Sequence, residues 1–425
     1  MRDRPVVRML TSFYCFASDL DDRGAEAALD EMQEAGATGV TLAAAYHASR
    51  DLFPRARRSR LRFLRGGEVH FRPDPTLWRG AALQPLGGER ETLGELVALA
   101  GRRGMHVDGW TVFCHVDRER DLPSGLAEET CFGDQVPTQL CPANPAVREY
   151  VVTLAREVAR RGVRAVVAES LHFHGFDHGA HHERAFVRLS PTARSVLGNC
   201  FCRHCCDDDA LRGAARAHVE AAFAADSDDG RAATPAILDA LLPGHRARRE
   251  ERVSSLVAEV AFACREQGSA LVFLDASGAT KGYATGQPAG GPAPEVAWTM
   301  GVDVAACAHA AGAIGAIAYA ADPARVTLDL AAYRELAGPD VALEAVLRPS
   351  APDCSDSANL TAKLAACAAR GVRSVGLYHY GLMPAPAFER ASAALRGQTR
   401  SPSELSGSTP HAPPDPPAQA RAPSP

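Results

Sequence analysis

The sequence predicts an α/β fold, a (β/α)8 TIM barrel of eight parallel strands, on three observations. Eight short apolar stretches alternate with stretches of helical periodicity along most of the 425 residues. Such alternation is typical of a parallel sheet whose strands are joined by helices. No Gly-rich phosphate-binding turn follows the first strand, which weighs against the alternative of a doubly wound sheet. One barrel with insertions accommodates a chain of this length.

The first half of the chain supplies four of the expected strands, at 6–16, 39–45, 105–113 and 163–168. The expected helices cover 22–35, 91–103 and 145–161. Asn144 is suited to cap the last of these and Pro145 to occupy its first position. A polar insertion follows the second strand over about 48–88. Within it, 61–65 and 68–72 flank Gly66 and Gly67, which favours a hairpin.

The second half repeats the pattern after a long insertion over about 171–267. This insertion is rich in Cys and His at its start and is mostly helical from 190 onward. The remaining strands are expected at 270–274, 313–319, 341–347 and 374–378, with helices at 327–337, 359–370 and 387–395. The barrel domain is therefore 1–397. A Pro- and Ser-rich tail, 398–425, is expected to be disordered.

Composition excludes several classes of function. With 46% hydrophobic and 23% charged residues and a net charge of −5, the chain is typical of a globular protein and shows no basic stripe for nucleic acid. No apolar run is long enough for a membrane helix, and the N-terminus lacks a secretory signal. We expect a cytoplasmic protein, in which twelve cysteines serve as metal ligands and buried thiols.

In a barrel, the carboxyl ends of the strands converge on the active site. The polar residues at or near those ends are Asp19, His47, His115, Glu169, Asp275, Asp322, Arg348 and His379. We expect substrate contacts from Asp19, His47, His115, His172, His182, Arg348, Tyr378 and His379. The sequence therefore predicts one polar pocket assembled from distant segments.

Glu169 is the strongest candidate for a catalytic role. It ends the apolar stretch 163–168, and a carboxylic acid in that position can protonate a leaving-group oxygen. The alternative is a carboxylate paired with an arginine for structure. Glycoside hydrolysis needs a second carboxyl, and the sequence leaves Asp275, Asp322 and Glu344 open as its source.

The spacing Cys200-x-Cys202-x2-Cys205 predicts a metal site. Thiolates at these intervals can surround one face of a tetrahedral Zn2+, and the fourth ligand usually comes from a distant segment. Cys141 is the best fourth ligand, with Cys206 and His204 as alternatives. Four thiolates leave no open position, so we expect a structural zinc.

The histidines that follow Glu169 have three candidate roles. His178, His181 and His182 with Glu183 form a group that suits a second metal, sugar hydroxyls, or a polar loop of hydrogen-bonded side chains. The series lacks the i, i+4 histidine pair of a helical zinc-protease site.

The order CPANPAVREY, then an apolar strand ending in Glu, then CFCRHC resembles the family 42 β-galactosidases of the large clan of retaining barrel glycosidases. The resemblance covers about 139–206. It implies that Glu169 is the general acid/base and that the four zinc ligands are Cys141, Cys200, Cys202 and Cys205. The chain departs from the family at Ala168, where the family has Asn. It also departs at the seventh strand, where the family ends in a nucleophilic Glu and this chain has Glu344 in mid-strand and Arg348 near the end.

The leading hypothesis is a glycoside-hydrolase-like barrel that acts on a small carbohydrate by acid/base catalysis and carries a structural zinc. One alternative is a metal-dependent hydrolase or lyase that uses the His-rich loop. The other is a glycan-binding barrel without catalysis. The sequence leaves the oligomeric state open, with a homo-oligomer as one option.

Overall fold

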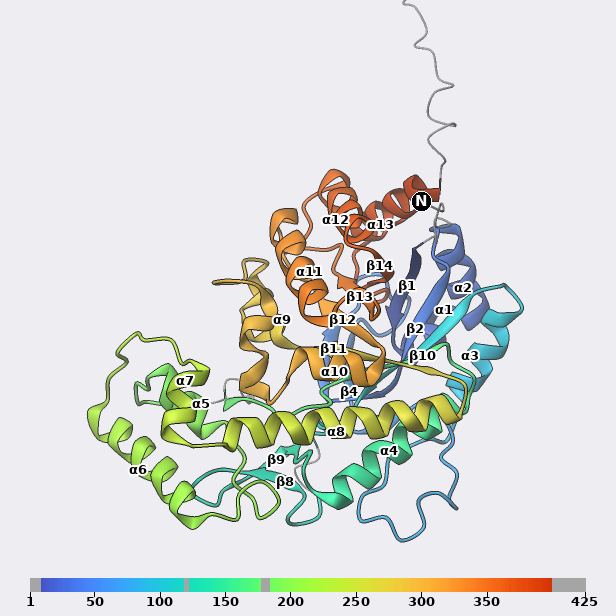
Figure 1. The fold of residues 1–425 in the computed structure, drawn as a ribbon. Helices are drawn as coiled ribbons and strands as arrows, with labels where there is room; N and C mark the ends of the chain where they lie inside the picture. The colour runs from blue at the N-terminus through green and yellow to red at the C-terminus, as the bar shows by residue number, and fades with distance from the viewer. Residues whose placement is uncertain (1–8, 118–121, 177–183, 400–425) are drawn as a thin grey trace, which may run out of the picture.

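Eight parallel strands close into a barrel, as the sequence predicts (Figure 1). The computed structural model describes residues 9–117, 122–176 and 184–399. The barrel strands are β1 (Leu10–Cys15), β2 (Gly39–Tyr46), β7 (His106–Val112), β10 (Ala165–Glu169), β11 (Ala270–Asp275), β12 (Ala313–Ile317), β13 (Ala342–Leu347) and β14 (Val372–Leu377). Each pairs with the next in chain order, and β14 pairs with β1 to close the ring. The predicted tail beyond 399 lies outside the described residues.

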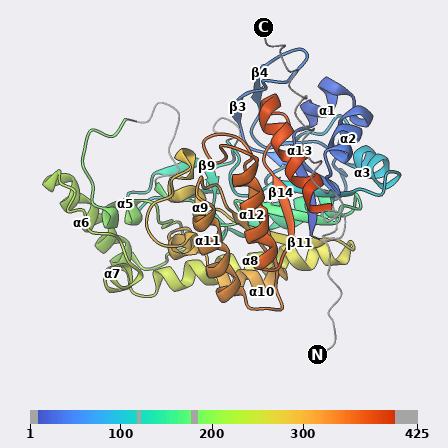
Figure 2. The same cartoon turned by 90° about the horizontal axis from the view of Figure 1, so that it is seen from above.

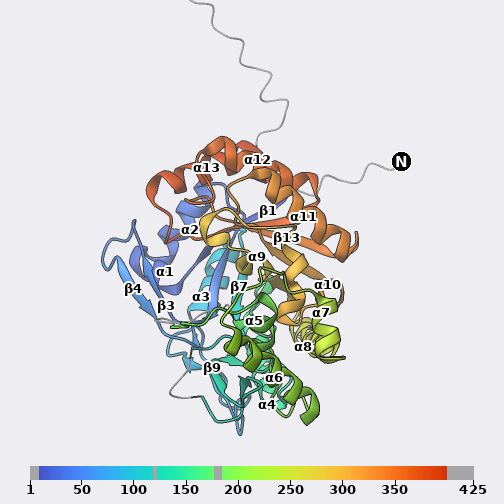
Figure 3. The same ribbon diagram turned by 90° about the vertical axis from the view of Figure 1, so that its left-hand side faces the viewer.

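Helices surround the barrel on its outer side (Figures 2 and 3). They are α1 (Ala17–Arg23), α2 (Ala25–Glu34), α3 (Thr92–Gly101), α4 (Pro145–Ala159), α8 (His245–Glu266), α10 (Val304–Ala311), α11 (Pro323–Ala337), α12 (Ser357–Ala369) and α13 (Ala385–Thr399). The single helix expected at 22–35 is two helices, because Gly24 adopts a φ of 87° and interrupts the turn. Among the described residues, no helix has the length and apolar character needed to cross a bilayer.

The start of α4 matches its predicted cap. The Asn144 side chain accepts a hydrogen bond of 2.9 Å from the Ala146 N–H, and Pro145 takes the first helical position. Val147, Val151 and Leu154 then face the barrel and are fully buried. The segment after β9 is therefore held firmly at the point where Cys141 precedes the helix.

The prediction that 61–65 and 68–72 pair as a hairpin in the first insertion is wrong. This insertion contains β3 (Ser49–Leu52), β4 (Leu61–Leu64), β5 (Glu68–Val69) and β6 (Leu86–Gly87). The β4 strand pairs with β3, whereas β5 pairs with β2 of the barrel. Val69 is buried and Phe63 is 71% exposed, so the two segments belong to different environments. Gly66 and Gly67 carry the chain into the core instead of reversing it onto itself.

Two further insertions carry the candidate metal ligands. The first is a hairpin of β8 (Ala127–Glu129) and β9 (Gln135–Leu140), which the sequence analysis did not anticipate. The second contains α5 (Pro191–Leu197), α6 (Asp209–Ala225) and α7 (Pro235–Leu241), which project to one side of the barrel (Figures 1 and 2). These helices have a small core of their own, which includes Val196, Phe201, Leu211, Val219 and Leu238. The long α8 that follows belongs to the outer ring, where it packs against α4 and α10.

The loop after β11 is more regular than its Gly/Pro-rich sequence suggests. It contains α9 (Ser277–Thr280) and two 3-10 helices, η2 (Tyr283–Thr285) and η3 (Ala293–Met300). Tyr283 is buried there, and its hydroxyl donates a hydrogen bond to Asp329 of α11. The loop is therefore anchored to the outer ring.

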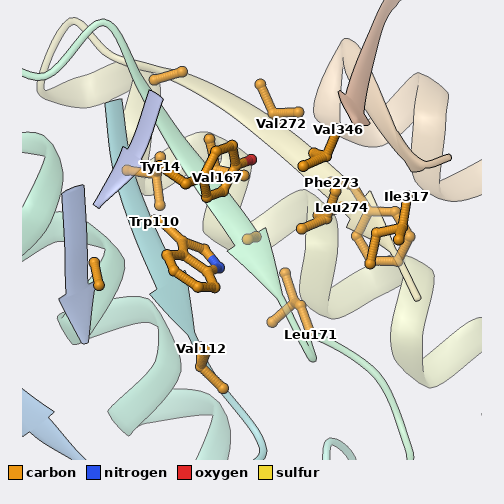
Figure 4. Close-up of a cluster of buried hydrophobic side chains, with 14 of the residues drawn as sticks. Tyr14, Trp110, Val112, Val167, Leu171, Val272, Phe273, Leu274, Ile317 and Val346 are labelled. Carbon is orange, nitrogen blue, oxygen red and sulfur yellow. The ribbon is translucent and has the colours of Figure 1, made fainter. Parts of the chain in front are cut away.

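Side chains fill the bore of the barrel. Tyr14, Val167 and Val272 lie on the inner face, and the Trp110 ring lies beside Tyr14 (Figure 4). Gly376 is required opposite Tyr14, because a β-carbon there would overlap the tyrosine ring. The cavity that remains in this layer measures about 10 Å³, which holds about one water molecule at most.

The amino end of the bore contains a partly buried ion network, in which Asp108 is buried and Arg164 and Glu344 are partly exposed. Arg164 lies 2.6 Å from an Asp108 oxygen and 3.0 Å from a Glu344 oxygen. Burial raises the pKa of both carboxyls, and the guanidinium opposes that rise. Glu344 therefore has a structural partner at the end of the barrel opposite to the strand-end site.

We predict that Arg164→Met lowers the free energy of unfolding by about 3–5 kcal/mol at neutral pH, because it leaves two carboxylates buried without a cation. The loss should be smaller at pH 5 than at pH 8, since both carboxyls bind protons more readily once the arginine is gone. Urea unfolding at the two pH values measures it. Arg103→Met, which removes only an exposed ion pair with Asp30, is the control and should leave the midpoint nearly unchanged.

Candidate functional site

Glu169 lies at the carboxyl end of β10 and faces the barrel interior. Residues alternate along a strand, so Glu169 shares the inner face with Val167. Its Oε2 atom accepts a hydrogen bond of 2.6 Å from the indole N–H of Trp110, which is 2% exposed. The carboxyl is thus held in one orientation at the barrel mouth, by which we mean the carboxyl ends of the strands and the loops that follow them.

Aromatic rings form the floor beneath this carboxyl. The Trp110 ring lies 5.1 Å from Tyr14, 4.5 Å from Tyr46 and 5.8 Å from Tyr378, measured between centroids. The rings meet edge to face, an arrangement that stabilises aromatic clusters. Tyr378 is partly exposed, whereas Tyr46 is buried. The floor is rigid and apolar, and it offers one tyrosine to a ligand.

The other three predicted catalytic carboxyls lie elsewhere. Asp275 faces outward from β11, where it accepts hydrogen bonds from the Tyr333 hydroxyl of α11 and from Ser277. Asp322 is exposed and caps α11 through a 2.8 Å hydrogen bond from the Ala324 N–H. Glu344 belongs to the network at the opposite end of the bore. Of the four predicted carboxyls, Glu169 is the one that faces the interior at the mouth.

Arg348 occupies the end of β13, where the resemblance implies a nucleophilic glutamate. Its guanidinium pairs with Asp353 at 2.9 Å and donates to the Tyr283 carbonyl at 3.0 Å. It also lies over the ring of Tyr319, 4.8 Å from the centroid. The arginine is therefore held by the loop after β11 and by its own loop. The contact between Arg348 and a substrate stays a prediction.

Asp19 and His379 are buried neighbours. Asp19 Oδ2 accepts from the Phe16 N–H at 2.9 Å and lies 3.9 Å from His379 Nδ1. Burial raises the pKa of Asp19 to about 7. Burial lowers the pKa of His379 to about 3, so this imidazole is neutral. Asp19 is 4% exposed and His379 is 1% exposed, so both side chains lie beneath the surface of the mouth and do not line it.

The predicted binding residues His47, His115 and His172 form a row at the mouth together with His174. Centroid distances are 4.9 Å from His47 to His115, 5.4 Å from His115 to His174, and 5.4 Å from His174 to His172. Asp117 lies beside the first two, with its Oδ1 atom 3.0 Å from His115 Nε2. The predicted binding residue His182 and the group His178, His181 and Glu183 lie outside the described residues.

The four predicted cysteine ligands come together in the structure. Cys141 Sγ lies 3.9 Å from Cys200 Sγ, 3.6 Å from Cys202 Sγ and 3.4 Å from Cys205 Sγ. All four sulfur atoms lie within 4.8 Å of one another and are buried. Four thiolates bonded to Zn2+ at about 2.3 Å are separated by about 3.8 Å, whereas a disulfide brings sulfur atoms to about 2.05 Å. The cluster can therefore hold a tetrahedral metal ion.

Neither alternative fourth ligand joins the cluster. The Cys206 thiol points to the Asp208 carbonyl at 3.4 Å, and His204 Nε2 lies 3.2 Å from Arg203 Nε. The buried cation Arg249 lies nearby, and the charges of Glu128, Cys205 and Cys200 act on it. A positive charge in this position suits a site with four thiolates and a divalent ion, which together carry a net negative charge.

Several residues of the site were not found from the sequence. Tyr46 gave no signal beyond its place at the end of a strand. Asp117 follows an irregular segment, and Glu128 lies on the unanticipated β8. Glu128 Oε1 accepts a 2.8 Å hydrogen bond from the His174 N–H, and burial raises its pKa to about 8. Contacts of this kind depend on which loops meet at the mouth. A single sequence contains no local pattern that predicts which loops meet.

Neither a protein-family model nor a curated protein sequence matches the chain. Solved structures share its fold. A β-galactosidase from the Antarctic haloarchaeon Halorubrum lacusprofundi matches with a TM-score of 0.54 at 14% identity, over 92% of this chain and 58% of that one. The β-galactosidase of the psychrophilic Marinomonas ef1 matches with a TM-score of 0.54 at 11% identity, over 91% and 59%. The chain thus spans less than two thirds of these two proteins.

A third similar structure is the catalytic domain of a β-amylase from Paenibacillus polymyxa, with a TM-score of 0.53 at 8% identity over 93% of this chain and all of that one. The shared property is the fold. Identities this low carry no residue roles from one chain to another.

We predict that Asp19→Asn becomes more stable relative to the unaltered protein as pH rises from 4 to 8. The unfolded carboxyl releases its proton near pH 4, whereas the folded carboxyl holds it up to about pH 7. Ionisation in that interval therefore disfavours folding, and asparagine does not ionise. The relative gain is on the order of 1–4 kcal/mol, measured by urea unfolding. The exposed Asp340→Asn is the control, and an equal trend in both variants would contradict the prediction.

Proposed function

We propose that this barrel is a glycoside-hydrolase-like enzyme that acts on a carbohydrate, with Glu169 as its general acid. The observation that carries the proposal is the Glu169 carboxyl, held at 2.6 Å by a buried tryptophan at the carboxyl end of β10. A carboxyl fixed in one orientation at the mouth can deliver a proton to a glycosidic oxygen without the entropy cost of orienting the donor first. The aromatic floor beside it suits the apolar face of a sugar ring.

Glycoside hydrolysis needs a second carboxyl beside the general acid. Asp275, Asp322 and Glu344 do not face the interior at the mouth, so none of them is proposed for that role. The seventh strand ends in Arg348 and supplies no carboxylate at the position that the resemblance implies.

Two further observations favour a β-galactosidase-like substrate range as the first to test. The cysteine motif and the strand that ends in Glu169 resemble the family 42 β-galactosidases, and two β-galactosidases share the fold. The proposal extends to a structural Zn2+ at the thiol cluster. That ion would tie Cys141, next to α4, to the loop between α5 and α6, and it would take no part in the reaction.

We predict that Glu169→Gln lowers kcat about 10²–10⁴-fold on aryl glycosides with poor leaving groups, because those need protonation. With 2,4-dinitrophenyl glycosides, whose leaving group needs no proton, the loss should be much smaller. A panel of aryl glycosides that begins with galactosides measures both.

Glu335→Gln, at an exposed position of α11, is the matched control and should leave kcat unchanged. Equal activity of Glu169→Gln and the unaltered enzyme on every substrate would remove the assignment. Saturable sugar binding without turnover in the unaltered protein would favour a glycan-binding barrel instead.

We predict that the thiol cluster binds one zinc per chain, which is lost in Cys202→Ser and retained in Cys206→Ser. The two cysteines are close in sequence, but only Cys202 lies in the thiol cluster. Elemental analysis and the thiolate-to-metal absorption of the Co2+ form measure binding. Limited proteolysis should cut the α5–α7 insertion of Cys202→Ser first. An unchanged zinc content in Cys202→Ser would contradict the site.

A further inference from the structure

A second group of metal-binding side chains lies at the barrel mouth, apart from the thiols. His47 follows β2, whereas His115 and Asp117 follow β7. One nitrogen of each imidazole and one carboxylate oxygen all lie within 4.8 Å of one another. His115 Nε2 is 3.0 Å from Asp117 Oδ1, and His47 Nδ1 is 3.9 Å from Asp117 Oδ2. Among the described residues, this group and the thiol cluster are the two sets with such proximity.

The backbone and neighbouring rings hold these three side chains in place. Asp117 Oδ2 accepts from the Ala48 N–H at 3.0 Å, and His47 Nδ1 lies 2.8 Å from the Ala48 carbonyl. The His47 ring stacks on Tyr46 at 4.1 Å and on His115 at an interplanar angle of 13°. An imidazole that donates to a backbone carbonyl keeps a lone pair on its other nitrogen, which is the form that ligates metals.

The adjoining imidazoles provide a second observation. His172 is 2% exposed, its Nδ1 lies 2.6 Å from the Phe173 carbonyl, and its Nε2 has no hydrogen-bond partner in the described part of the chain. A buried polar nitrogen without a partner costs free energy and is retained in proteins for a reason.

We propose that His47, His115 and Asp117 bind one divalent first-row transition-metal ion at the barrel mouth, with its remaining coordination positions open. Two imidazoles and one carboxylate suit Zn2+, Fe2+, Co2+ or Ni2+ better than Mg2+ or Ca2+, which prefer ligand sets made of oxygen alone. Three protein ligands leave positions for water or for two neighbouring hydroxyls of a carbohydrate. Ligation at about 2.1 Å requires the three side chains to move closer together.

The ion would lie on the same side of the barrel as Glu169. Direct contacts connect the two places, from His47 to Tyr46, from Tyr46 to Trp110 at 4.5 Å, and from Trp110 to Glu169. Metal binding is nevertheless independent of what Glu169 does. A failure of the proposed glycosidase activity would leave this site untouched, and its test uses no substrate.

The experiment titrates Co2+ into the full chain after the thiol cluster has been filled with Zn2+ and the excess removed. We expect one further equivalent of Co2+, with weak d–d absorption and without thiolate charge transfer. His47→Ala and Asp117→Asn should each weaken this binding at least about 100-fold. His309→Ala changes an exposed histidine of α10 and is the matched control that should bind normally.

A second measurement covers the case in which a variant does not fold. In the unaltered protein, bound Co2+ should shift the NMR signals of the His47 and His115 rings while leaving those of His309 in place. The proposal is overturned if the second equivalent does not bind at millimolar Co2+. It is also overturned if His182→Ala abolishes binding while His47→Ala and Asp117→Asn retain it, since the ion would then belong to another site.

Discussion

A closed barrel allows each strand only one inner face, and this constraint positions the whole candidate site. On β10 the inner face carries Val167 and then Glu169. Glu169 follows the last side chain of β10 that fills the bore, so its carboxyl is the first group on this face that can reach the mouth. Trp110 lies next to it because Val167 and Trp110 are direct neighbours across the β7–β10 pair. The hydrogen bond between indole and carboxyl follows from strand register, and it does not depend on any loop.

The loops add chemistry that the barrel alone does not have. The insertion after β7 contributes Cys141 and Glu128, and the insertion after β10 contributes the other three thiols and His174. The two insertions meet at Glu128, which contacts the His174 backbone and whose charge acts on Arg249 beside the thiols. An ion at the thiol cluster would therefore hold in place the loops that carry part of the histidine row. The Phe201 N–H also donates to the Glu129 carbonyl, so stability of the insertions and geometry of the mouth are coupled through several contacts.

Much of the fold was readable in the sequence because parallel strands buried on both faces give continuous apolar runs. The same property hides which face a residue is on. Asp275 ends such a run, but alternation directs it outward to Tyr333, and nothing in the apolar stretch 270–274 reveals that direction. Cys200, Cys202 and Cys205 were predictable as a group because their spacing is a local pattern, whereas Cys141 was one of three candidates for the fourth ligand. The partner of β4 and the position of Asp117 were not, since both depend on contacts between segments distant in the chain.

The packing of the Tyr14 ring against Gly376 limits the routes by which a molecule can approach Glu169. The ring fills the barrel axis at this level, and the cavity that remains in the bore is about 10 Å³. No tunnel of useful width can run along that axis from the Arg164 end to Glu169. A molecule that binds at the Glu169 carboxyl therefore reaches it from the mouth side of the barrel and does not pass through the bore from the Arg164 end.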